Sequence, residues 1–176
     1  MADLAWGARV SPEFLTTLVA ACGRLKIADP SWLMACMAFE TGETFSPSVL
    51  NKEGSGAVGL IQFMPQTAAQ LGTSTEILAS LTAEQQLQFV EGYFTTWRGH
   101  LHNLGDVYGA IIWPGMIGQQ DDFVVFSKDD EQHPKRYVEN AGLDFNHDGE
   151  ITRGEIVARV QQELTRGLLA ENVATI

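Results

Sequence analysis

Glu40 has the sequence context of an acid–base group, because it ends an apolar helical stretch. The segment Met37-Ala-Phe-Glu-Thr-Gly42 carries this single carboxylate, and the later apolar segment Ala57-Val-Gly-Leu-Ile-Gln-Phe-Met-Pro65 carries one amide, Gln62. Apolar surroundings and the C-terminal end of a helix dipole both raise the pKa of a carboxylic acid. Such an acid can donate a proton near neutral pH, as cleavage of a glycosidic bond requires. The alternative is a surface carboxylate that merely lies beside a core helix.

A second group of oxygen-bearing residues has the spacing of a calcium-binding loop. The stretch Asp144-Phe-Asn-His-Asp-Gly-Glu-Ile-Thr-Arg-Gly-Glu155 places oxygen side chains, a turn glycine and a closing glutamate at the positions that an EF-hand loop requires. The expected ligands are Asp144, Asn146, Asp148, the main-chain carbonyl of Glu150, Thr152 and Glu155. Because the chain has one such loop, we expect one structural Ca²⁺ ion that ties the terminal helix to the domain. The alternative is an acidic turn that stays empty.

Helices and one loop must position these residues. Expected helix starts carry a capping residue followed by proline or a capping-box partner, and they lie at Ser11-Pro12, Asp29-Pro30, Thr82–Gln85 and Asp106. The stretch that leads to Gly42 is apolar on more than one face, which predicts a central helix. Residues 46–58 have the Pro, Asn, Gly and Ser content of a loop. Because alternation is confined to a possible short strand at 123–126, the sequence predicts a mainly α protein.

Composition narrows the function classes. The chain has 176 residues, 45% of them hydrophobic, and a net charge of −11, which argues against binding to nucleic acid or to anionic membranes. We expect no membrane insertion, because no apolar run has the length of a membrane span. The N-terminal residues lack a basic region followed by an apolar core, so no secretory signal is expected. Cys22 and Cys36 lie in apolar helical patterns and are expected to be small buried residues rather than a disulfide pair.

In its motifs the chain resembles the lytic transglycosylase and goose-type lysozyme superfamily, most closely its phage and prophage murein-degrading members. The resemblance covers roughly residues 10–140. The matching segments are 39–42, 45–47, Asn51, 54–57, 59–65, 67–68 and 71–72. It implies a lysozyme-like single domain over residues 1–140, with the calcium loop and terminal helix of residues 141–176 packed on the same domain. It also implies cleavage of the β-1,4 bond between N-acetylmuramic acid and N-acetylglucosamine in peptidoglycan.

The resemblance makes Glu40 the catalytic acid. Its proton would go to the leaving oxygen, and its carboxylate would then accept a proton from the muramyl 6-hydroxyl, which gives a 1,6-anhydro product. No cofactor is expected for catalysis. Gln62 matches a substrate-contacting amide, although it could instead cap a neighbouring backbone group. Ser55 and Gly56 match a loop near the cleft.

Three other residues have open roles. Glu43 could raise the pKa of Glu40, act as the second carboxylate of a true hydrolase, or be a solvated loop residue. The family's Tyr-Asn pair after a helix is missing here, where the chain has Ala-Ile-Ile-Trp-Pro-Gly115. Trp113 could pack against sugar rings or against the core. Tyr137 matches a downstream family tyrosine and could replace the missing hydroxyl near Glu40.

We therefore expect a monomeric peptidoglycan-degrading enzyme, made in the bacterial cytoplasm, that acts on the periplasmic cell wall during phage lysis or after virion delivery. Two alternatives remain. One is a hydrolytic lysozyme of the same bond specificity. The other is a calcium-binding, wall-binding module on a catalytically dead scaffold.

Overall fold

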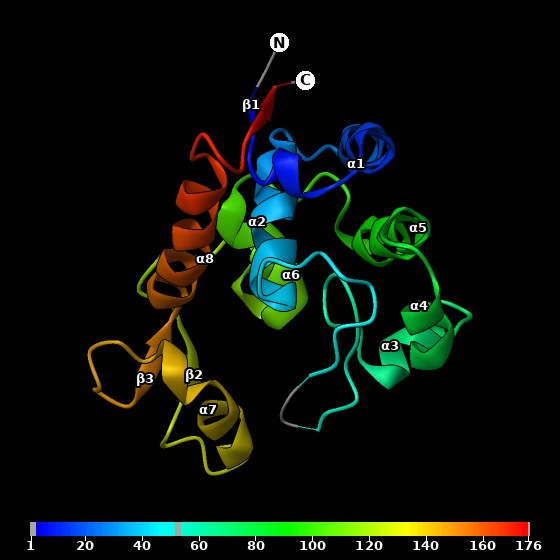
Figure 1. The fold of residues 1–176 in the computed structure, drawn as a ribbon. Helices are drawn as coiled ribbons and strands as arrows, with labels where there is room; N and C mark the ends of the chain where they lie inside the picture. The colour runs from blue at the N-terminus through cyan, green and yellow to red at the C-terminus, as the bar shows by residue number, and fades with distance from the viewer. Residues whose placement is uncertain (1–2, 52–53, 176) are drawn as a thin grey trace.

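Helix α2 (Pro30–Thr41) runs through the middle of the molecule, with other helices packed on several of its sides (Figure 1). The computed structural model describes residues 3–51 and 54–175. Eight of the twelve residues of α2 are buried, including Leu33, Met34 and Met37. A helix that is apolar around its axis is stable only when other elements surround it. The expected central helix is confirmed, as is the mainly α fold class, with 54% helix and 8% strand.

The remaining elements follow α2 or precede it in this order. The α-helices are α1 (Pro12–Leu25), α3 (Pro65–Gln70), α4 (Thr75–Ser80), α5 (Ala83–Phe94), α6 (Leu104–Ile112), α7 (Pro134–Asn140) and α8 (Arg153–Gly167). The short 3-10 helices are η1 (Gly7–Arg9), η2 (Thr95–Trp97), η3 (Pro114–Met116) and η4 (Ala141–Leu143). The strands are β1 (Asp3–Leu4), β2 (Val124–Ser127), β3 (Glu150–Thr152) and β4 (Ala174–Thr175).

Most of the expected helix starts are confirmed by their caps. Ser11 accepts a hydrogen bond from the Phe14 N–H, and the capping box of Thr82 and Gln85 is complete. The start expected at Asp106 is wrong by one turn. Asn103 caps α6, and Asp106 lies inside its first turn, because the Asp106 carboxylate is already occupied by groups outside the helix.

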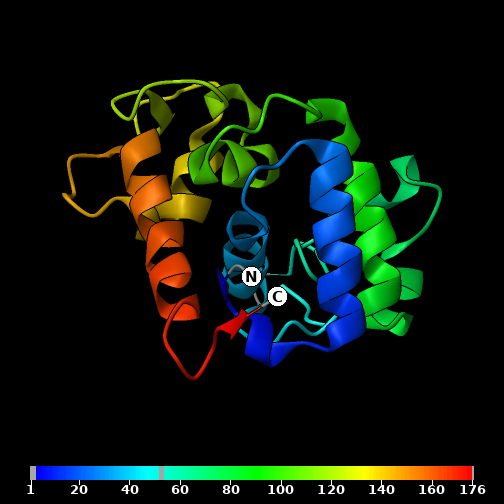
Figure 2. The same ribbon diagram turned by 90° about the horizontal axis from the view of Figure 1, so that it is seen from above.

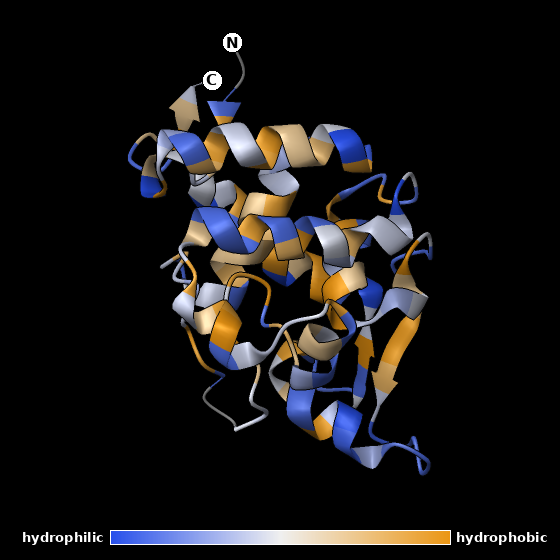
Figure 3. Ribbon diagram, turned by 90° about the vertical axis from the view of Figure 1, so that its right-hand side faces the viewer, coloured by the Kyte–Doolittle hydropathy of each residue, from blue (hydrophilic) through white to orange (hydrophobic). Residues whose placement is uncertain are grey.

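Two helix layers flank α2 (Figure 2). Helices α1 and α5 lie side by side on one flank, whereas α8 packs along α2 on the other. Hydrophobic residues concentrate in the middle of the molecule and hydrophilic residues on its outer turns (Figure 3). Cys22 and Cys36 are buried and unpaired as expected, and burial raises the pKa of the Cys22 thiol to about 12. Within the described residues, every helix is too short or too polar to cross a membrane.

The two ends of the described chain pair with each other. Strands β1 and β4 are antiparallel, with Asp3 opposite Thr175 and Leu4 opposite Ala174 (Figure 1). Trp6 follows β1 and is fully buried, with its indole N–H donating to the carbonyl of Glu163 in α8 at 2.9 Å. The N-terminal segment therefore fastens α8 to the core.

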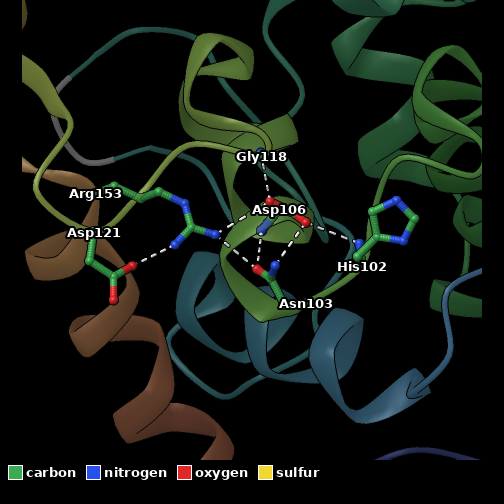
Figure 4. A network of polar contacts seen from close by, with 6 residues as sticks. All are labelled: His102, Asn103, Asp106, Gly118, Asp121 and Arg153. Atoms are coloured by element: carbon green, nitrogen blue, oxygen red, sulfur yellow. Dashed lines mark hydrogen bonds and ion pairs between the residues drawn. The ribbon is translucent and has the colours of Figure 1, made fainter.

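A buried polar cluster joins α8 to α6 (Figure 4). Arg153, the first residue of α8, is 7% exposed and donates to Asp121 at 2.6 Å and to Asn103 at 2.9 Å. Its ion pair with Asp106 spans 3.3 Å, and the Asp106 side chain is 1% exposed. Asp106 also accepts from main-chain N–H groups, those of His102 and Gly118. Because these groups satisfy one another, the start of α8 is held against the start of α6.

Candidate active-site cleft

Glu40 lies in the last turn of α2, beside the core and at the edge of solvent. Burial raises the pKa of its carboxyl from 4.5 to about 7. A hydrogen bond from the hydroxyl of Tyr108 acts in the opposite direction, because it stabilises the charged form. A carboxyl with this pKa is available in both protonation states near neutral pH, which suits it to donate and then to accept a proton.

A cleft of about 730 Å³ opens beside Glu40. The end of α2 forms one wall through Phe39, Glu40 and Thr41, and the loop behind it forms the other. Residues of that second wall include Val49, Leu50, Asn51 and Gln62. The structure thus brings Glu40 and Gln62 to the same cleft, as the sequence predicts.

Gln62 has two jobs at this wall. Its side-chain nitrogen donates to the carbonyls of Val49 and Gly59, both at 3.1 Å. Both amide protons are used in this way, so the side-chain oxygen is the atom suited to accept a bond from a ligand. Its backbone is left-handed, with φ 52°, a conformation that costs a residue other than glycine of order 1 kcal/mol. The capping role and the cleft-lining role expected as alternatives are therefore combined in one residue.

Gln86 holds the same wall from behind and has no counterpart among the sequence predictions. It is fully buried in α5, accepts from the Leu60 N–H at 2.7 Å, and donates to the carbonyls of Pro47 and Leu78 at 3.1 and 2.9 Å. A side chain at Gly59 would collide with it, so glycine is required there. The only available signal was a polar residue at a core-facing position of a helix, which does not identify its partners.

Tyr108 is the tyrosine that supports Glu40, and sequence reasoning missed it. It is buried in α6, and its ring packs edge-on against Phe39 at 5.5 Å between centroids. Burial raises the pKa of its hydroxyl well above 10, so this hydroxyl stays protonated and acts as a donor. A buried tyrosine needs a partner for its hydroxyl, and this requirement was the available signal.

Tyr137 does not replace the missing hydroxyl, because it points into the calcium loop. Its hydroxyl donates to the Asp144 carboxylate at 2.6 Å. Helix α7, which carries Tyr137, packs on β2 and β3 rather than on α2. The expectation that placed Tyr137 near Glu40 is therefore corrected.

Trp113 and Glu43 are also engaged in packing and pairing. The Trp113 ring lies 5.9 Å from that of Phe126, and the guanidinium of Arg136 covers it at 4.5 Å from the ring centroid. This arrangement agrees with the core-packing alternative for Trp113. Glu43 follows the helix end at Gly42, has φ 66°, and forms an ion pair with Arg166 of α8. Since this cation neutralises it, Glu43 is unsuited to act as a second catalytic carboxylate.

Ser55 and Gly56 are exposed and lie outside the residues that line the cleft. The Ser55 hydroxyl accepts from the Ala57 N–H at 3.3 Å, which shapes the turn. Gly56 has φ 77°, and a side chain there would press on Pro65. Both residues form the turn above the cleft wall.

Replacing Tyr108 by phenylalanine is expected to raise the pKa of Glu40 above 7. The reason is that the variant removes a hydrogen bond that stabilises the carboxylate. Carbon-detected NMR titration of the Glu40 carboxyl measures this shift directly. Tyr93→Phe is the matched control, because the Tyr93 hydroxyl donates to the Ala110 carbonyl at 2.6 Å rather than to Glu40. An unchanged Glu40 titration in Tyr108→Phe would contradict the assignment.

The calcium-loop residues form a folded turn at the start of α8. Asp144 is 3% exposed; one of its oxygens accepts from the Gly149 N–H at 3.0 Å, and the other is buried with no partner among the described residues. The Glu155 carboxylate accepts from the N–H groups of Phe145 and Thr152 at 3.1 and 2.9 Å. In the described part of the chain, no three His, Cys, Asp or Glu side chains converge as a metal site would require. The orphaned Asp144 oxygen, however, has the chemistry of a cation ligand.

Comparison with known proteins adds no assignment: no family model, no curated protein and no solved structure matches this chain.

Proposed function

We propose that this protein is a peptidoglycan-degrading enzyme with a lysozyme-like fold, which cleaves the β-1,4 bond between N-acetylmuramic acid and N-acetylglucosamine. The observation that carries the proposal is Glu40, whose burial raises its pKa to about 7 at the wall of an open cleft. A neutral carboxyl at this position can protonate a glycosidic oxygen. Tyr108, which was missed in the sequence, supplies the hydroxyl whose apparent absence favoured a dead scaffold.

The cleft favours internal attack over attack by water. Among the described residues that line it, Glu40 is the only carboxylate. Glycosidases that add water generally use two carboxyl groups, one on each side of the bond. With one carboxylate, Glu40 would first protonate the leaving oxygen and then accept the proton of the muramyl 6-hydroxyl, which closes a 1,6-anhydro ring. Its pKa near neutrality serves both steps.

Product analysis tests this proposal. The protein is incubated with purified bacterial cell walls while turbidity is followed, and the released fragments are weighed by mass spectrometry. Anhydro ends, which are lighter than reducing ends by one water, are the expected result. Reducing ends would indicate the hydrolytic lysozyme instead. Walls that stay turbid and release no fragments would overturn the enzymatic proposal and leave the wall-binding module. Action as a monomer during phage lysis or from a virion stays a prediction.

We also propose that the loop from Asp144 to Glu155 binds one structural Ca²⁺ ion. The supporting observation is the buried, unpartnered oxygen of Asp144 at the first position of the loop. The ligands would be those that the sequence predicts, with Glu155 closing the site. Strand β3 of the loop pairs with β2, and α8 begins directly behind it, so a bound ion would stabilise the junction between these elements.

Calcium is expected to raise the melting temperature of the protein. Saturation at about 100 times the dissociation constant adds about 2.7 kcal/mol, or roughly 5–10 °C for a chain of this size. Asp144→Asn should lose this rise, because it removes a charge but keeps an acceptor for Gly149. Asp129→Asn, an exposed acid outside the loop, is the matched control. No heat of binding in calorimetry, together with an unchanged melting temperature, would refute the site.

A further inference from the structure

The cleft beside Glu40 continues into a second hollow on the outer side of α5. Gln62 lines both the cleft and a narrow neck of about 60 Å³, and the neck is also lined by Thr67 and Tyr93. Thr67 and Tyr93 in turn line a wider hollow of about 380 Å³. We call this hollow the distal groove; its lining includes Thr67, Gln70, Leu71, Tyr93, Thr96 and Trp97. Shared lining residues thus make one continuous surface from Glu40 to Trp97.

Two aromatic rings form the firm part of the distal groove. The rings of Tyr93 and Trp97 lie 5.2 Å apart between centroids, at an interplanar angle of 52°. The Tyr93 hydroxyl is fixed by its hydrogen bond to the Ala110 carbonyl at 2.6 Å, and the Trp97 side chain is half-buried. Because their positions are fixed by packing, these rings offer an ordered apolar surface to a ligand at little entropic cost.

The chemistry of the distal groove fits a neutral ligand with many hydroxyl groups. Beside the two rings it offers the hydroxyls of Thr67 and Thr96 and the amide of Gln70. No Asp, Glu, Lys or Arg is among the described residues that line it. Burial and the charge of Glu40 raise the pKa of Tyr93 to about 12, so this residue is neutral as well. In a chain of net charge −11, an uncharged hollow of this kind matches sugar rings better than charged peptide stems.

We propose that the distal groove binds sugar residues of the glycan strand whose scissile bond lies at Glu40. This inference rests on the proposed function, and it assigns Trp97 as the main contact away from the reacting bond. Sugar rings have apolar faces that pack on aromatic rings, and hydroxyls at the ring edge can bond to Thr67, Gln70 and Thr96. The neck at Gln62 joins the two binding regions, so one strand can occupy both.

A remote contact of this kind raises the rate only for substrates that reach it. Binding energy from parts of the substrate far from the reacting bond can be used to hold that bond in place. Long strands should therefore be cleaved more efficiently than short oligosaccharides, and removal of the Trp97 ring should reduce this advantage. A contribution of about 1.4 kcal/mol corresponds to a tenfold effect.

Chain-length kinetics with peptide-free glycan strands test the proposal. Trp97→Ala is expected to lower kcat/KM on long strands about tenfold, the effect of losing about 1.4 kcal/mol, and to leave cleavage of a tetrasaccharide unchanged. Trp97→Phe, which keeps a ring, should retain most of the wild-type rate on long strands. Arg98→Ala changes the exposed neighbour and should behave as the wild type. Equal melting temperatures of the variants confirm that the fold is kept.

Binding to the inactive Glu40→Gln protein separates the two proposals. Calorimetry with long peptide-free strands should show binding that Trp97→Ala weakens about tenfold. A wild type that cleaves glycan, with Trp97→Ala equal to it at every chain length, would overturn the distal groove and leave the proposed function standing. A Trp97→Ala defect seen only with peptide-bearing strands would assign the groove to the stem peptide and overturn the sugar assignment. A wild type that neither cleaves nor binds glycan would overturn both proposals.

Discussion

Glu40→Gln is expected to abolish glycan cleavage while the fold is kept. Glutamine has nearly the shape of glutamate and can still accept a bond from Tyr108, but it has no proton to donate to the leaving oxygen. Loss of one general acid–base group lowers rates by about 10²–10⁴-fold, and Glu40 serves both proton transfers, so the upper end is expected. Turbidity clearing and fragment release from purified cell walls measure the loss.

The same variant should be more stable than the wild type above pH 7. The pKa of Glu40 rises from 4.5 to about 7 in the folded protein. The folded state therefore holds its proton more tightly, and the stability that this gives is complete below pH 4.5 and lost as the pH rises through 7. The loss is at most about 3 kcal/mol, and less where water reaches the carboxyl. Melting curves at pH 4 and pH 8 should show the variant gaining relative to the wild type only at pH 8.

Glu13→Gln is the matched control for both effects, because Glu13 is an exposed carboxylate in the first turn of α1. It should keep wild-type activity and show no gain in stability at pH 8. Two outcomes would contradict the assignment of Glu40: activity retained in Glu40→Gln, or an equal stability of variant and wild type at both pH values.

Arg153→Ala is expected to cause the largest loss of stability among the variants considered. It leaves the carboxylate of Asp106, 1% exposed, without its cation. Breaking a buried ion pair by removing one partner costs about 3–5 kcal/mol. The main-chain N–H groups that still bond Asp106 favour the lower end, near 3 kcal/mol, or roughly 6–12 °C in melting temperature. Urea unfolding followed by circular dichroism measures the change.

Two further variants separate this pair from its surroundings. Asp121→Asn changes the exposed partner of Arg153 and should cost less than about 1 kcal/mol, because exposed pairs contribute little. Asp106→Asn combined with Arg153→Met should be less destabilised than Arg153→Ala, because no buried charge is left unpaired. An Arg153→Ala loss as small as that of Asp121→Asn would contradict the role of the cluster.

The features that the sequence predicts well are those that depend on neighbours along the chain. The capping residues Ser11 and Thr82, the helix end at Gly42 and the central position of α2 each follow from a few consecutive residues. The closeness of Glu40 and Gln62 followed from the resemblance, and the structure agrees with it. Local geometry and hydrophobic pattern are sufficient for these features.

The features that were missed depend on contacts between distant segments. Tyr108 reaches Glu40 because α6 packs across α2, and Gln86 reaches Pro47 and Leu60 because α5 lies behind the cleft loop. Asp106 looked like a helix cap, but Arg153 pairs with it from far along the chain. None of these partners can be identified from spacing in the sequence, because each is set by how whole helices pack.

The pairing of β1 with β4 makes the described chain nearly a closed ring. In Figure 1 both ends lie at the top of the molecule, and the loop that forms the cleft wall lies at the opposite side. A surface tether or a fluorescent fusion attached at either end would therefore emerge at one place and leave the cleft open. A short peptide bridge between residues 175 and 3 would permit circular permutation, with new ends cut in an exposed turn such as 128–133.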